Sequence, residues 1–174
     1  MRKLQLTELN RKSQFELHQS PKWPVRIILD NLRSAHNIGS VFRTADAFLT
    51  DKIYLCGITA CPPNREISKT ALGAAESVAW QYCENTLQAI EDCKAAGYQI
   101  VVIEQTTESV ILDDFNPEGP VALVFGNEVN GVSEAVLPAC DAAVEIPQFG
   151  TKHSFNVSVC AGIILYAIQV KMKV

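Results

Sequence analysis

The chain has 174 residues, of which 48% are hydrophobic and 20% charged, a balance that excludes a disordered protein and suits one ordinary domain with its own core. The net charge of −4 argues against a protein that coats nucleic acid nonspecifically. The first residues lack the apolar segment of a signal peptide, and no apolar run approaches the roughly 20 residues of a membrane span, so we expect a cytoplasmic protein without membrane contact.

Six cysteines are scattered without any C-x-x-C pair, which indicates reduced thiols and neither a disulfide framework nor a zinc site. No metal is therefore expected. The charges are unevenly distributed: eight basic residues stand against three acids up to Arg43, whereas eight acids stand against Lys94 between Glu84 and Glu118. The basic pole is consistent with a surface that faces phosphates and equally with an ordinary solvated face.

Residues 1–24 are polar and weakly helical, and they are expected to form an N-terminal arm in which Trp23 docks onto another surface. The run over 25–30 predicts a strand, because consecutive β-branched residues suit a strand covered on both faces. The alternation then continues with a helix over 37–48, a strand over 52–56 and a short helix over 66–72.

The second half of the chain repeats this pattern. Strands are predicted over 77–82, 98–104, 120–125 and 142–146, helices over 86–96 and 133–137, and residues 106–117 are expected to be mostly connection. Ser133 is the expected cap of the second of these helices. Alternating strands and helices predict one α/β domain over 25–174, with a mostly parallel sheet flanked by helices. In such sheets, ligands bind beyond the carboxyl ends of the strands.

Three polar stretches directly follow predicted strands, and the first begins at Asp30. Gly39 and Arg43 are four residues apart and share a helix face, so the missing side chain of Gly39 is expected to leave room beside the guanidinium. Asn37 lies at the start of this helix, where it can cap the helix or hold a ligand hydroxyl.

The second stretch, residues 125–133, reads FGNEVNGVS. Gly126 and Gly131 permit a tight turn with exposed backbone N–H groups, and Glu128 offers a carboxylate.

The third stretch begins with Ile146 and Pro147, and the proline biases its neighbour away from helix. An apolar helix follows and continues to the end of the chain, with Ser154 as its expected N-cap and Asn156 inside its first turn. Apolar residues at helical spacing predict that one face of this helix is buried and that its start is held rigidly.

Each stretch alone is a weak signal, since glycine-rich turns follow strands in many α/β proteins. None matches G-x-G-x-x-G or the P-loop, which argues against a dinucleotide or nucleoside triphosphate site. His36 and His153 flank the stretches, but single histidines beside loops are more often hydrogen-bonding or exposed than catalytic. Lys152 is expected to meet a phosphate.

Together and in this order, the stretches closely resemble the TrmH (SpoU) family of the SPOUT class of RNA methyltransferases. The motif N-x-G-x-x-x-R stands at Asn37, Gly39 and Arg43, and F-G-N-E stands at 125–128, followed by Gly131. The third motif, I-P then S-L-N-V-S, stands at 146–147 and 154–158, with Phe155 in place of the usual leucine. The resemblance spans residue 25 to the C-terminus.

This resemblance implies methyl transfer from S-adenosylmethionine to a ribose 2′-hydroxyl in tRNA or rRNA. It also implies a deep C-terminal trefoil knot, which pattern alone would not suggest, and a homodimer whose active sites combine both chains. Arg43 is the principal catalytic candidate, and because an arginine guanidinium is a poor base, an electrostatic clamp on phosphate and alkoxide is the favoured role. Asn37, Ser154 and Asn156 would orient the ribose and the loop, and Glu128 would hold Arg43 or a loop N–H.

The cofactor would rest on backbone groups of the second and third stretches and on a neighbouring strand end. Its expected contacts are Gly126, Ile146, Phe155, Glu104, Gln105 and Thr106. Two other readings stay open: a noncatalytic RNA-binding or scaffolding relative of the same fold, and methylation of a base nitrogen, although the S-F-N-V-S form favours the ribose branch.

Overall fold

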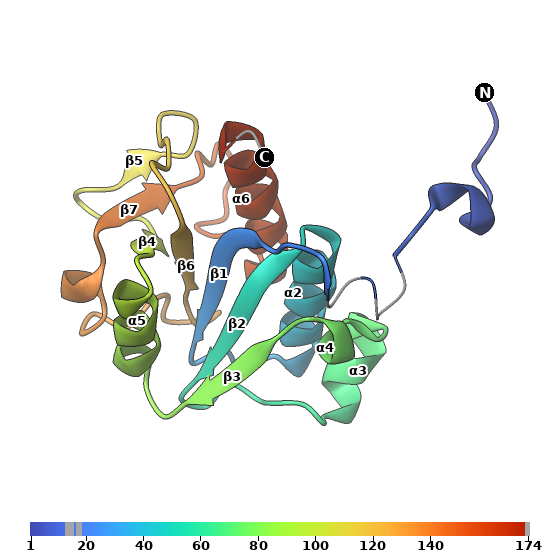
Figure 1. The fold of residues 1–174 in the computed structure, drawn as a ribbon. Coiled ribbons are helices and arrows are strands. Elements are labelled where there is room, and N and C mark those ends of the chain that lie inside the picture. The colour runs from blue at the N-terminus through green and yellow to red at the C-terminus, as the bar shows by residue number, and fades with distance from the viewer. Residues whose placement is uncertain (13–15, 17–18, 173–174) are drawn as a thin grey trace.

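The computed structural model describes residues 1–12, 16 and 19–172, and within them a seven-stranded sheet organises the chain (Figure 1). The strands are β1 (Trp23–Asp30), β2 (Thr50–Cys56), β3 (Trp80–Cys83), β4 (Gln99–Ile103), β5 (Val110–Ile111), β6 (Val121–Phe125) and β7 (Ala142–Glu145). The α-helices are α2 (Ala35–Ala47), α3 (Arg65–Ala71), α4 (Ala74–Ser77), α5 (Thr86–Ala95) and α6 (Val157–Met172). Two 3-10 helices, η1 (Leu6–Leu9) and η2 (Leu137–Ala139), complete the described elements.

The strand order is β3-β2-β1-β6-β4-β7-β5, and the pairings between these named strands are parallel. This confirms the predicted α/β domain with a mostly parallel sheet. Because parallel strands need crossover connections, the helices cover the faces of the sheet. Parallel strands also place their carboxyl ends along one edge, which is where the polar stretches were expected to meet.

Two apolar cores form, one on each face of the sheet. Ile27 and Leu29 of β1 point toward the core under α2, α3 and α6, whereas Ile28 points into the core beside α5. All three side chains are fully buried, as predicted for a strand covered on both faces. Figure 1 shows α5 on one side of the sheet and α2 and α6 on the other.

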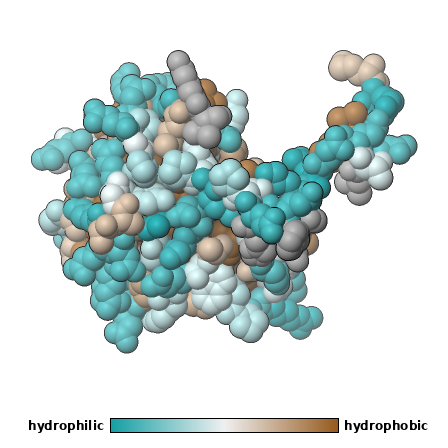
Figure 2. All heavy atoms as spheres, viewed as in Figure 1, coloured by the Kyte–Doolittle hydropathy of each residue, from teal (hydrophilic) through white to brown (hydrophobic). Residues whose placement is uncertain are grey.

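Trp23 is the first residue of β1 and is only 4% exposed, so its ring belongs to the core and not to the arm, where docking on another surface was expected. Residues 1–12 lie away from the sheet, and their surface is mostly hydrophilic (Figure 2). Residues 13–15 and 17–18 of the expected arm lie outside the described residues.

Two predicted elements are corrected by the structure. The helix predicted over 133–137 is wrong, because residues 134–136 form a turn that leads into η2. Ser133 caps no helix; its backbone N–H donates to the Asp30 carboxylate at 2.8 Å. The strand predicted over 77–82 begins only at Trp80, because residue 77 ends α4.

Two expectations concern the chain as a whole. Within the described ranges, no helix is long and apolar enough to cross a bilayer. The trefoil knot stays a prediction.

Candidate active site

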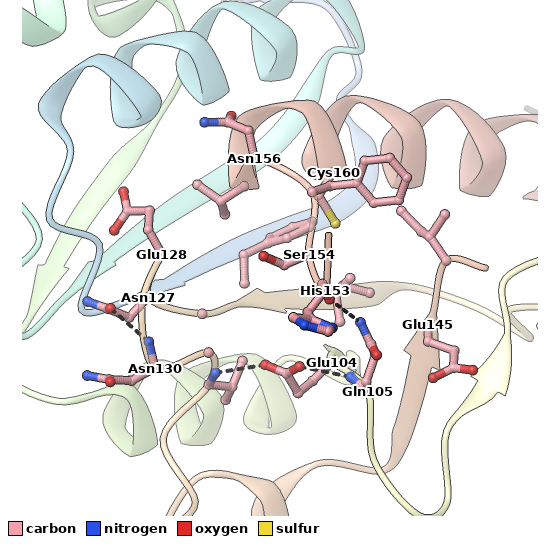
Figure 3. A pocket seen from close by; sticks show the side chains of 18 of the residues that line it. Glu104, Gln105, Asn127, Glu128, Asn130, Glu145, His153, Ser154, Asn156 and Cys160 are labelled. Carbon is pink, nitrogen blue, oxygen red and sulfur yellow. Dashed lines mark hydrogen bonds between the residues drawn. The ribbon is translucent and has the colours of Figure 1, made fainter. Parts of the chain in front are cut away.

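The second and third polar stretches meet at the carboxyl edge of the sheet around a cavity of about 670 Å³. Its walls come from the ends of β4, β6 and β7, from the loop after β6 and from the start of α6 (Figure 3). The volume lies within the range of roughly 300–1,000 Å³ typical of small-molecule sites. The first stretch contributes no lining residue and joins the site through hydrogen bonds to Glu128 and Asn156.

The loop after β6 forms a tight wall that requires its glycines. Asn127 and Gly131 exchange two backbone hydrogen bonds of 2.9 Å each, which close the loop. A Cβ on Gly126 would lie 2.2 Å from the backbone of Gly131 and Val132, a distance that side chains do not reach. Gly131 has a φ of 68°, the left-handed region that favours glycine. The glycines were therefore correctly identified as requirements of the turn.

A buried carboxylate at the end of β1 holds this wall in place. Asp30 is 1% exposed and accepts hydrogen bonds from the Thr86 hydroxyl, the Asn31 amide (2.8 Å) and the Ser133 backbone N–H (2.8 Å). The Asn127 amide donates to the Asn31 carbonyl at 2.6 Å. Sequence reasoning did not identify Asp30 as part of the site. The available signal was an acid at the end of an otherwise apolar buried strand, since such a charge must find partners.

Glu128 connects the loop after β6 to the start of α2. Its carboxylate accepts from the backbone N–H groups of Arg33 (3.0 Å) and Ser34 (3.1 Å) and from the Asn37 amide (3.0 Å). Desolvation by partial burial acts to raise the pKa of Glu128, but these donors together hold it below its ordinary value. Of the two roles expected for Glu128, the structure shows the contact with loop N–H groups and no contact with Arg43.

Two asparagines connect α2 with α6. The Asn156 amide donates to the Asn37 side-chain oxygen at 3.1 Å, and the Asn156 oxygen accepts from the backbone N–H of Ser158 at 3.0 Å. Asn156 is therefore the residue that caps α6, and the expectation that Ser154 is its N-cap is wrong, because the helix begins only at residue 157. Ser154 instead lines the cavity. At α2 the N-cap is Ser34, whose hydroxyl accepts from the Asn37 N–H.

Arg43 lies outside the cavity. It stands six residues after Asn37 on α2, which is about 9 Å along the helix axis at roughly 1.5 Å per residue. Its side chain is exposed and makes no hydrogen bond or ion pair with any residue that the structure describes. The space expected beside it at Gly39 is filled by α3, because a Cβ on Gly39 would lie 2.1 Å from the Thr70 hydroxyl and 2.3 Å from the Ile67 carbonyl oxygen.

Most of the expected cofactor contacts line the cavity: Gly126, Ile146, Phe155, Glu104 and Gln105. Thr106 does not, and its backbone N–H and carbonyl are engaged in a turn with the Ser109 hydroxyl. Cys160 of α6 also lines the cavity and was not expected there. Burial raises the pKa of the Cys160 thiol to about 12, so it acts as an apolar wall and not as a nucleophile.

The lining has a distinct charge character. Apolar side chains such as Ile103, Phe125 and Val144 form part of the surface, and three glutamates stand around it, whereas no lysine or arginine contributes to the lining. Within the described residues, no group of three or more side chains could hold a metal ion. The arrangement suits an organic ligand with a flat apolar part and a positive charge.

Comparisons with known proteins agree with this geometry. The model of the family described as SpoU rRNA Methylase matches residues 24–166. A 23S rRNA (guanosine-2′-O-)-methyltransferase, RlmB, of Neisseria meningitidis is 35% identical over 142 residues, which are 82% of this chain and 56% of the relative. A tRNA (guanosine(18)-2′-O)-methyltransferase of Aquifex aeolicus is 33% identical over 144 residues, which are 82% and 67% of the two chains.

Solved structures show the same fold. The TrmH/SpoU tRNA modifying enzyme of A. aeolicus superposes with a TM-score of 0.81 at 28% identity, over 92% of this chain and 82% of that chain. An AdoMet-bound rRNA methyltransferase from Sinorhizobium meliloti gives a TM-score of 0.80 at 29% identity, over 88% and 59%. The chain spans 56–59% of the length of several of its curated relatives. With its family model matched over most of its length and its fold shared, this chain belongs to the SpoU rRNA methylase family.

Proposed function

We propose that this chain is an S-adenosylmethionine-dependent methyltransferase that acts on a ribose 2′-hydroxyl in tRNA or rRNA. The observation that carries the proposal is the meeting of two loops at one cavity, to which the start of α2 is joined by the hydrogen bonds of Asn37 with Glu128 and Asn156. Family membership supports the reaction class, and relatives named as 2′-O-methyltransferases of 23S rRNA and of tRNA support the substrate class.

The cavity suits S-adenosylmethionine, which combines a flat adenosine with a cationic sulfonium. The tight loop after β6 offers backbone groups to a neutral adenine, the apolar residues cover its ring, and the glutamates complement the positive charge. When bound, the cofactor supplies a methyl group whose bonding electron pair returns to sulfur as the ribose oxygen forms its bond to carbon and releases its proton to solvent. The chain must therefore mainly position the hydroxyl and favour its deprotonation.

Asn37 and Asn156 are the groups best placed to orient the ribose. Both amides are already fixed: Asn37 donates to Glu128 and accepts from Asn156, and Asn156 accepts from the first turn of α6, so neither has to be ordered when RNA arrives. Ser154 lines the same cavity. Arg43, with no partner among the described residues, remains available to hold a phosphate and to stabilise an alkoxide.

A homodimer would bring Arg43 to the cavity. The outer face of α6 carries Val159, Tyr166 and Val170, which are 52%, 63% and 58% exposed and recur at helical spacing together with Ile163. An apolar stripe of this kind is typical of a subunit interface. In the proposed dimer, Arg43 of the partner subunit completes the site that Asn37 and Asn156 begin. The trefoil knot, an N-terminal arm that ends before Trp23 and a cytoplasmic location belong to the same proposal.

Labelled methyl transfer to bulk tRNA and rRNA, followed by mapping of the modified nucleotide, tests the activity. A label on a ribose 2′-oxygen is expected. A label on a base nitrogen would replace the ribose assignment, and cofactor binding without any labelled RNA would favour the noncatalytic scaffold. Arg43→Lys distinguishes charge from shape: retained activity would mean that charge suffices, and near-complete loss would mean that the planar guanidinium is required.

Subunit mixing tests the shared site. Arg43→Ala and Asn156→Ala homodimers should each be inactive, because both sites of each dimer lack one group. After exchange of subunits, a mixed dimer contains one intact site and one site with both defects, so activity should reappear. If Arg43 acted within its own subunit, every site in the mixed dimer would still carry one defect, and no activity would return.

A further inference from the structure

The carboxylates around the cavity are held by neutral donors. Glu128 is bound by two backbone N–H groups and the Asn37 amide, and Glu145 accepts from the Ser109 hydroxyl at 3.0 Å. Glu104 accepts from the backbone N–H groups of Val132 and Gln105. None of the three forms an ion pair with a described residue, so each keeps its negative charge uncompensated.

Of the three, Glu104 follows the middle one of the strands that end at the cavity. It follows β4, which lies between β6 and β7 in the sheet, and its carboxylate is bound at 3.1 Å to the Val132 N–H and at 2.9 Å to the Gln105 N–H. A Cβ on Gly131 would lie 2.3 Å from its carboxylate oxygen. Burial is the main cause of the raised pKa of the Cys160 thiol on α6, and the charge of Glu104 raises this pKa further. The charge of Glu104 therefore acts across the cavity. Figure 3 shows the Glu104 carboxylate between the loop that follows β6 and Gln105, with the two hydrogen bonds dashed.

We infer that Glu104 is the residue by which the cavity distinguishes the charged methyl donor from its neutral thioether product. This inference rests on the proposed function. Transfer of the methyl group removes the positive charge from sulfur and leaves the rest of the ligand unchanged. A fixed carboxylate in a partly desolvated cavity therefore stabilises the ligand before the reaction more than after it.

The geometry favours this role because, among the described residues, Glu104 forms no ion pair and no lysine or arginine lines the cavity. A carboxylate paired with lysine or arginine would present little net charge to a ligand, whereas one held by N–H groups remains an anion with a fixed position. The expected consequence is weak product binding, which leaves the cavity free to accept a new donor after each methyl transfer.

Calorimetric titration of the full chain with S-adenosylmethionine and S-adenosylhomocysteine tests the inference without any RNA or turnover. Glu104→Gln should weaken binding of the charged donor about tenfold, equivalent to about 1.4 kcal/mol, and change binding of the neutral product less than about twofold. Glu104→Asp, which keeps the charge, should retain the preference. Sinefungin, in which an amine replaces the methylsulfonium, should follow the charged donor.

Two control variants distinguish the charge of Glu104 from that of a carboxylate outside the cavity and from that of another lining carboxylate. Glu108→Gln removes a carboxylate that is exposed and does not line the cavity, and it should leave both affinities unchanged. Glu145→Gln removes another lining carboxylate and should reduce the preference less than Glu104→Gln. Urea denaturation of each variant checks that the Val132 and Gln105 segments remain folded.

Equal loss of both ligands in a folded Glu104→Gln protein would overturn the inference, because it would mean that Glu104 contacts a part common to donor and product. Unchanged binding of both would overturn it as well and leave Glu104 only a structural role in holding the loop. Failure of the wild-type chain to bind either ligand is a different result, since it would count against the proposed cofactor itself.

Discussion

The two walls of the cavity differ in how they are held. The wall after β6 is joined to the segment between β1 and α2 by hydrogen bonds of Asp30, Asn31 and Glu128. Of these residues, Asp30 carries a fully buried carboxylate. The wall after β7 has fewer ties: residues 149–156 are all exposed, and Phe149 is 97% exposed. Its His153 carbonyl accepts from Gln105 after β4 at 2.8 Å and from Gln148 of the same loop at 3.4 Å, and its Asn156 amide donates to Asn37 of α2.

The difference indicates a division of labour. A wall fixed by buried hydrogen bonds is already in position before a ligand arrives, so binding does not have to order it. A wall with few buried contacts opens at low free-energy cost and can admit both cofactor and RNA. Substitutions on the first wall should therefore affect stability, and those on the second should affect ligand exchange.

The largest effect is expected from Asp30→Ala, which leaves the buried Thr86 hydroxyl without its acceptor and also removes the partly buried acceptor of the Ser133 N–H. Unsatisfied buried donors cost roughly 1–3 kcal/mol each, so the free energy of unfolding should fall by about 3 kcal/mol in urea titration. Asp114→Ala, at an exposed position, serves as the matched control and should change it by less than about 0.5 kcal/mol. Equal effects of the two substitutions would contradict the assigned role of Asp30.

Gly126→Ala and Gly150→Ala compare the two walls directly. A Cβ at Gly126 would collide with the backbone of Gly131 and Val132, whereas nothing lies within 4 Å of a Cβ at Gly150. Overpacking typically costs about 1–3 kcal/mol, so Gly126→Ala should lower the melting temperature and weaken cofactor binding, while Gly150→Ala should do neither. A Gly150→Ala protein as unstable as Gly126→Ala would show that the second wall is as constrained as the first.

Glu128→Gln should change how stability depends on pH. Because the pKa of Glu128 is lowered in the folded protein, its contribution is fully present above the ordinary glutamate pKa of about 4.3 and is lost as pH falls through the folded value. The wild-type free energy of unfolding should decline more steeply than that of the variant below that pH. At neutral pH the variant should be less stable by about 1 kcal/mol, the usual value of such hydrogen bonds. Parallel curves in denaturant titrations from pH 6 to 3 would refute the linkage.

The smallest effect on stability is expected from Gln105→Ala, which removes the 2.8 Å hydrogen bond to the third loop. Since this bond is exposed, the free energy of unfolding should change by less than about 0.5 kcal/mol. The dissociation rate of the cofactor, measured by stopped-flow competition, should nevertheless rise a few-fold, because the second wall then opens more often. A large loss of stability with an unchanged dissociation rate would reverse the proposed contrast.

The sheet could be predicted because its signal is local and repeated. Continuous apolar runs identified β1, β4 and β6, and the motif glycines identified the turn after β6. The errors came where tertiary contacts replace local preference. Ser133 looked like a helix cap because serine caps helices well, but its N–H is used by Asp30, which is distant in sequence.

The sequence predicted which residues belong to the site, but not how these residues contact one another. Motif spacing brought Asn37, Glu128 and Asn156 into one proposal, and the structure joins them by hydrogen bonds. The motif spacing did not reveal that Arg43 lies outside the cavity lining, because a helical position fixes a direction only relative to its own helix. The motif spacing also could not show that α3 fills the space at Gly39, since that contact depends on how α2 and α3 pack.

The order of the strands also fixes a dimension of the cavity. The walls extend from the ends of β6 and β7, and β4 alone lies between these two strands. Neighbouring strands lie about 4.8 Å apart, so the walls stand roughly 10 Å from each other, comparable with the span of a nucleoside. This separation is determined by peptide hydrogen bonding and not by any particular side chain. Relatives that share less than a third of their residues with this chain can therefore preserve the same opening while exchanging almost everything around it.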